Sequence, residues 1–131
     1  MRTINEHKVN PANDLLEITV LDDPGPGGAN HSYQITGAKI HGNPSYPGQP
    51  IDNSVMTILF QNGAINESGV NGLTQEVLLA IVIDRLRAFQ AGKFACRENA
   101  LALTKIEEAQ HWLLHRTRAR IDRGVEGKTA I

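Results

Sequence analysis

The chain has 131 residues, which suffices for one domain or a small two-part domain. Its formal net charge of −1 argues against a protein that binds polyanions with its whole surface, and its single cysteine, Cys96, excludes an internal disulfide and fits a reducing cytosol. We expect neither a secretory signal in residues 1–14 nor a membrane span, because the longest apolar run, residues 77–83, is too short.

Alternating apolar residues predict three short strands in the first half of the chain. Residues 16–20 alternate between apolar and polar, as a half-buried strand does. Residues 33–40 predict a second strand, which we expect to shift its register through a bulge at Gly37. Residues 55–60 are apolar at nearly every position, so the third strand is predicted to be buried on both faces. Turn-forming Pro and Gly separate these strands, which favours a small antiparallel sheet.

The apolar residues of the second half follow a helical spacing. Thr74 is a suitable N-cap for a first helix, which Gly92 ends. A second helix is predicted from about residue 95 to Arg123, with Gly124 as its C-terminal stop. A connection as short as residues 92–94 forces the two helices to run antiparallel.

The predicted fold is therefore α+β. Residues 1–72 are expected to form a small N-terminal antiparallel β-sheet region, and residues 73–131 a long C-terminal antiparallel helical hairpin, together in one compact unit. The second helix outruns the first by roughly two turns, so its arginine-rich end should project beyond the hairpin.

Several segments of the second half resemble a known family. They are residues 60–63, 69–74, 78–86, 94–104 and 120–127. Together they are similar to Thoeris anti-defence protein one of bacteriophages, whose helical hairpin is shared with anti-CBASS protein two. Residues 27–33 are similar to the family's N-terminal half, so the resemblance covers most of the chain beyond residue 27.

This resemblance implies a phage-encoded sponge that works in the cytoplasm of the host cell. It implies binding of glycocyclic ADP-ribose, the signal of the Thoeris system, without cleavage, cofactor or metal. It also implies homo-oligomers, as dimers and as a hexamer built from three dimers, with separate sites in some members for the cyclic trinucleotides or dinucleotides of CBASS. Neither a nucleic acid polymer nor a membrane is an expected partner. Carried over by position, the signal site uses Phe89, Asn99, Arg116 and Arg120.

The residues themselves leave two interpretations open at each of these positions. Arg116 and Arg120 share one helical face and could grip a pyrophosphate, or they could be solvated cations favoured by the helix dipole. Phe89 could stack on adenine or pack in the core. Asn99 could read a base edge or a ribose hydroxyl, or it could make an interhelical hydrogen bond.

The spacing of the four residues has a consequence for assembly. Asn99 and Arg116 are 17 residues apart on one predicted helix, which is about 25 Å at 1.5 Å per residue. They cannot both touch one small ligand within a chain, whereas Phe89 stays near Asn99 across the hairpin turn. A pocket that contains all four residues therefore requires two antiparallel subunits, with two equivalent pockets in each dimer.

Other functions lack the residues that they need. His111 and His115 are four apart and could bind a metal, but no carboxylate or cysteine joins them, so they are interpreted as surface histidines, and Trp112 is expected to pack beneath the sheet or at an interface. A nucleotide-degrading enzyme would need carboxylates one turn apart to hold magnesium, and a nucleic-acid-binding regulator would need more net positive charge and interleaved aromatics. Because no nucleophile–base pair emerges, we predict a binding protein and not an enzyme.

Overall fold

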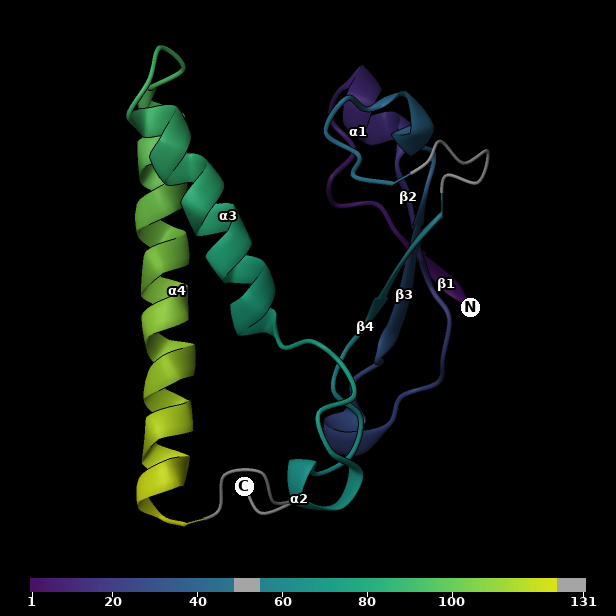
Figure 1. The fold of residues 1–131 in the computed structure, drawn as a ribbon, viewed down its shortest axis with the longest axis vertical. Coiled ribbons are helices and arrows are strands. Elements are labelled where there is room, and N and C mark those ends of the chain that lie inside the picture. The colour runs from purple at the N-terminus through teal and green to yellow at the C-terminus, as the bar shows by residue number, and fades with distance from the viewer. Residues whose placement is uncertain (49–54, 125–131) are drawn as a thin grey trace. The chain divides into compact units, whose positions relative to one another are not determined.

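The computed structural model describes residues 1–48 and 55–124 (Figure 1). It divides into two compact units, Met1–Asn62 and Gly63–Ile131. The first contains a four-stranded antiparallel sheet and the second contains the long helices, so the predicted α+β fold is confirmed.

The sheet has the strand order β1-β2-β3-β4, with every neighbouring pair antiparallel. Its strands are β1 (Arg2–Ile4), β2 (Glu17–Val20), β3 (Ser32–Thr36) and β4 (Met56–Leu59). Val20 pairs with Tyr33, which pairs in turn with Ile58, so the apolar side chains of three strands come into register. Val20 is only 1% exposed, and the rings of Tyr33 and Phe60 meet edge to face at 5.6 Å. This is where the sheet unit has its core.

Short elements connect the strands. α1 (Pro11–Leu15) precedes β2, the 3₁₀ turns η1 (Pro26–Gly28) and η2 (Ile40–Gly42) flank β3, and α2 (Ile65–Ser68) opens the second unit. Asn10 caps α1, because its side-chain oxygen accepts a hydrogen bond from the backbone N–H of Asn13.

Two predictions about the strands are wrong. β3 ends at Thr36 and does not continue through a bulge, because Gly37 takes a φ of +101° and packs directly against the backbone of Leu15. β4 is not buried on both faces, since Met56 is 37% and Leu59 51% exposed. A continuous apolar run therefore marked the strand correctly but not its burial.

The hairpin consists of α3 (Gln75–Gln90) and α4 (Arg97–Asp122), which lie side by side (Figure 1). Thr74 occupies the N-cap of α3 as predicted, although its side chain makes no capping hydrogen bond. Gly124, with a φ of +72°, follows the end of α4, also as predicted. In the described part of the chain, neither these helices nor any other is long and apolar enough to cross a membrane.

Two polar contacts link the two helices. Ile83, which lies on the same helical face as Arg87, is 7% exposed. Arg87 forms an ion pair with Glu107 at 2.6 Å. Nearer the start of α3, the side-chain amide of Gln110 donates to the backbone oxygen of Glu76 at 3.1 Å. The α3 helix has 16 residues and α4 has 26, so the C-terminal part of α4 extends beyond its partner helix.

Candidate functional site

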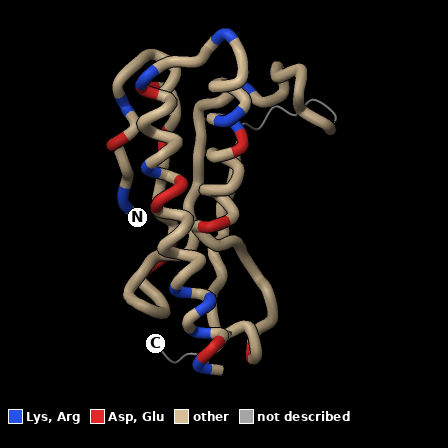
Figure 2. The backbone as a smooth tube through the Cα atoms, turned by 90° about the vertical axis from the view of Figure 1, so that its left-hand side faces the viewer, with Lys and Arg blue, Asp and Glu red and all other residues tan. Residues whose placement is uncertain are grey.

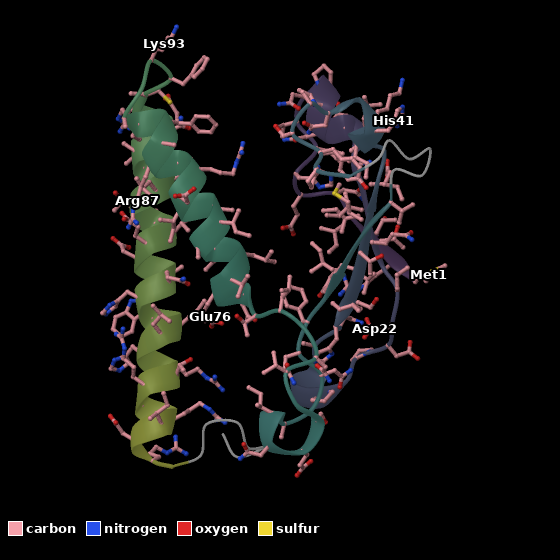
Figure 3. The ribbon with its side chains drawn as sticks, in the orientation of Figure 1. Met1, Asp22, His41, Glu76, Arg87 and Lys93 are labelled. Atoms are coloured by element: carbon pink, nitrogen blue, oxygen red, sulfur yellow. The ribbon has the colours of Figure 1, made fainter. Side chains whose placement is uncertain are left out.

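The bend of the hairpin, around Lys93 in Figure 3, carries two phenylalanines that are open to solvent. Phe89, in the last turn of α3, is 37% exposed, and Phe94 in the loop is 72% exposed. Their rings meet edge to face with centroids 6.4 Å apart. The guanidinium carbon of Arg85 lies 5.4 Å from the Phe89 ring centroid, close enough for a cation–π contact. The bend therefore presents an aromatic surface with a positive charge beside it.

Asn99 lies at the same bend, in the first turn of α4. Its backbone N–H donates to Sγ of Cys96, the N-cap residue, at 3.4 Å. Its side-chain nitrogen donates to the backbone oxygen of Phe94, also at 3.4 Å, so the amide bonds within the bend and not from helix to helix. Within residues 1–48 and 55–124, no protein donor reaches its side-chain oxygen, which is therefore available to a ligand.

Gln90 braces the loop that joins the helices. Its side-chain oxygen accepts from the backbone N–H of Cys96 at 3.1 Å, and its nitrogen donates to the Cys96 oxygen at 3.2 Å. This reciprocal pair fixes the start of α4 relative to the end of α3. Sequence reasoning missed both Gln90 and Arg85. The four-residue spacing of Arg85 and Phe89 was a usable signal, whereas the contact of Gln90 depends on the shape of the loop.

Arg116 and Arg120 lie one turn apart near the other end of α4. Arg116 is exposed and Arg120 is only 7% exposed. Several cationic positions gather along this end of the long helix (Figure 2). The exposed guanidinium of Arg116 has the fork geometry that binds a phosphate group bidentately.

The structure thus gathers the four predicted site residues into two pairs and keeps the pairs apart. Phe89 and Asn99 lie at the bend, while Arg116 and Arg120 lie 17 or more residues further along an uninterrupted α4. At 1.5 Å per residue the separation of Asn99 and Arg116 is about 25 Å. A single hairpin cannot close all four residues around one small ligand.

Comparison with known protein families also identifies a hairpin domain in this chain. The family model described as the Acb2/Tad1 hairpin domain matches residues 52–118, about half of the chain. The chain belongs to the Acb2/Tad1 hairpin family. The chain is also 55% identical over 71 residues to the protein "Thoeris anti-defense 1" of Bacillus phage SBSphiJ7, a match that covers 54% of this chain and 50% of that protein. This chain therefore matches about half the length of that relative.

The Acb2/Tad1 match confirms the family expected from the sequence and includes three of the four predicted site residues. Phe89, Asn99 and Arg116 fall within residues 52–118, and Arg120 lies two positions beyond them. The bend, with its open phenylalanines, and most of α4 thus belong to the hairpin that defines the family.

Among the described residues, no cluster of three or more His, Cys, Asp or Glu side chains could hold a metal ion. Glu107 is paired with Arg87, while Glu108 lies 3.9 Å from Lys105, so the two adjacent glutamates face different partners. His111 and His115 are exposed on α4, and Trp112, 65% exposed, contacts both rings.

Proposed function

We propose that the chain is a phage anti-defence protein that binds and sequesters glycocyclic ADP-ribose in the cytoplasm of the infected cell, without cleaving it. The observation that carries the proposal is the division of the hairpin into an aromatic, amide-bearing bend and a distant arginine pair. Membership of the Acb2/Tad1 family and the name of the phage relative, Thoeris anti-defense 1, support the anti-defence role.

Each end of the hairpin suits one part of this ligand. Phe89 offers a ring for adenine, and stacking of a base on an aromatic is worth about 1–3 kcal/mol. The side-chain oxygen of Asn99 can accept a hydrogen bond from a base amino group or a ribose hydroxyl. Arg116 and Arg120 can hold the pyrophosphate with charge-assisted hydrogen bonds, which are about twice as strong as neutral ones.

The pocket then forms between two subunits. In an antiparallel dimer, the bend of one copy meets the arginines of the other, and two-fold symmetry produces two identical pockets. Three such dimers would give the hexamer expected from the resemblance, and any cyclic trinucleotide or dinucleotide would bind at separate sites. Sequestration needs no turnover, so the protein acts stoichiometrically.

A capture experiment distinguishes this proposal from its alternatives. The protein is mixed with glycocyclic ADP-ribose, freed of unbound ligand and heat-denatured, and the released material is analysed by mass spectrometry. Release of intact ligand supports the sponge. A cleaved product would instead identify a nucleotide-degrading enzyme, and no retention together with salt-sensitive DNA binding would identify a nucleic-acid-binding regulator.

Single substitutions test three of the four residues. Phe89→Ala, Asn99→Ala and Arg116→Ala are each expected to abolish retention while the oligomer survives. Arg97→Ala, an exposed arginine in the first turn of α4, is the matched control and should retain the ligand as wild type does. Undiminished retention by the Arg116 variant would show that the arginine end takes no part in the site.

Mixing two inactive variants tests whether the pocket is shared. When Phe89→Ala and Arg116→Ala chains are unfolded and refolded together, half of the dimers are mixed, and each mixed dimer has one pocket with both an intact bend and intact arginines. About a quarter of the wild-type capacity should therefore return. A pocket made by one chain would recover nothing, because each chain would still carry its own defect.

A further inference from the structure

His111 and His115 form a pair of exposed imidazoles on one face of α4. Their rings are nearly parallel, with an interplanar angle of 25° and centroids 6.4 Å apart. Trp112 lies edge-on to both, at 5.2 Å from His111 and 5.7 Å from His115. In the described part of the chain neither imidazole takes part in a hydrogen bond or an ion pair, so the ring nitrogens are available.

We propose that this pair is a two-histidine chelate for a borderline transition-metal ion such as Ni²⁺, Zn²⁺ or Cu²⁺. Side chains four apart on a helix have Cβ atoms about 5–6 Å apart, and imidazole nitrogens bind such ions at about 2.0–2.1 Å. Both side chains are exposed, so their rings can turn toward one ion without disrupting a packed core. Water completes the coordination shell.

The surroundings decide which ions bind and how firmly. Nitrogen ligands favour Cu²⁺ over Ni²⁺ and Zn²⁺ and leave Mg²⁺ and Ca²⁺ unbound, because those ions require oxygen. Glu108, one turn before His111, is only loosely held by Lys105 at 3.9 Å and attracts a cation. Arg118, one turn after His115, opposes it. With two protein ligands, the site is an exchangeable one and differs from a closed structural zinc site, which has four ligands.

Trp112 supplies a built-in reporter for the test. It is the only tryptophan of the chain and touches both imidazoles, so a paramagnetic ion bound there should quench its fluorescence. The full chain without a histidine tag is titrated with Ni²⁺ alone at pH 7.5. We expect saturable quenching at one ion per chain, reversed by EDTA, and no response to Mg²⁺.

Substitutions locate the ligands. His111→Ala and His115→Ala should each weaken Ni²⁺ binding by roughly 100-fold, because loss of a direct ligand should cost at least as much as loss of its supporting residue. His41→Ala removes an exposed histidine of the sheet unit, and Cys96→Ser removes the exposed thiol; both should bind as wild type does. Circular dichroism checks that every variant keeps its helices.

One double variant separates chelation from mere histidine content. His115→Ala combined with Arg118→His keeps the number of histidines but places them seven residues apart, about 10.5 Å along the axis, too far to share an ion. This variant should bind no better than His115→Ala alone. The proposal is overturned if the double variant binds Ni²⁺ like wild type, or if Ni²⁺ quenches Trp112 fluorescence normally in both single variants. It is also overturned if saturation requires half an ion per chain, because that would indicate a site shared by two copies.

Discussion

At the scale of single residues, Gly37 is the position where the sheet unit tolerates a side chain least. Its φ is +101°, and a Cβ atom there would lie 1.9 Å from the backbone oxygen of Leu15. The oxygen belongs to the backbone and a Cβ atom is fixed directly to Cα, so neither can turn aside. Gly37→Ala should lower the free energy of unfolding by at least about 2 kcal/mol, measured by urea denaturation. Gly42→Ala is the control, since nothing lies within 4 Å of its added Cβ, and should change stability by less than about 0.5 kcal/mol.

Asp22 gives the sheet unit a dependence on pH. Desolvation alone would raise the pKa of its carboxyl group, but hydrogen bonds from the backbone N–H groups of His31 and Ser32, at 2.9–3.2 Å, outweigh it and lower the pKa below the ordinary 3.8. A carboxylate with a depressed folded-state pKa stabilises the protein above its unfolded-state pKa, and this contribution is lost as the pH falls through the folded-state value.

Replacing Asp22 with asparagine should therefore matter at neutral pH and not in strong acid. We expect Asp22→Asn to be less stable than wild type at pH 7, with the difference shrinking as the pH is lowered below 3.8. Urea denaturation of both proteins between pH 2 and pH 7 measures this. Equal stability at every pH would mean that the two backbone hydrogen bonds do not depend on the charge.

At the scale of elements, the local sequence pattern was enough to predict the ends of the helices. It was not enough to predict strands whose existence or length depends on contacts with other parts of the chain. Thr74 is a residue type that favours the N-cap position, and Gly124 can take the positive φ that follows a helix end, so both boundaries were predictable. β1 was missed because its three residues carry one apolar side chain, Ile4, and exist as a strand only by pairing with β2. The end of β3 depends on the approach of Gly37 to Leu15, which no local pattern records.

The candidate site also has features that the sequence predicted and features that it did not. The two pairs of candidate residues and the distance between them follow from positions on a helix, so the sequence predicted their arrangement within one chain. The contacts of Phe94 and Gln90 could not be predicted, because they depend on how the chain turns between Ala91 and Cys96. Loop geometry is set by such side-chain contacts across the turn and not by periodicity.

The bend itself should depend on Gln90 more than on the ion pair beside it. Gln90→Ala removes both hydrogen bonds to Cys96, at a cost of about 1–2 kcal/mol, and should speed amide hydrogen exchange at Cys96 and in the first turn of α4. Arg87→Ala removes the partner of Glu107 but, because the Arg87 side chain is 63% exposed, should cost less than about 1 kcal/mol and leave exchange at the bend unchanged. Equal effects of the two substitutions on exchange at Cys96 would contradict this assignment.

At the scale of the whole molecule, the hairpin has more apolar surface than one helix seam can cover. Two helices share a single interface, and apolar residues outside it need another partner. Several such residues of α3 and α4 are more than a third exposed: Val77, Ile81, Val82, Phe89, Leu101, Trp112 and Ile121. A second copy of the hairpin would cover part of this surface, and the shared pocket proposed above requires one.

Stability should therefore depend on protein concentration. For a dimer that unfolds to monomers, each tenfold increase in concentration adds about 1.4 kcal/mol per dimer, which raises the thermal midpoint by a few degrees. Ile81→Glu, at an apolar position of α3 that is 54% exposed, should shift the protein to monomers in light scattering and remove this dependence. Gln75→Glu changes an exposed polar position on the same helix and should leave the oligomeric state and the concentration dependence unchanged. The prediction is contradicted if the wild-type protein is monomeric at micromolar concentration and its thermal midpoint does not change with concentration. The exposed apolar residues of α3 and α4 would then not pair two chains, and the two-subunit pocket could not form.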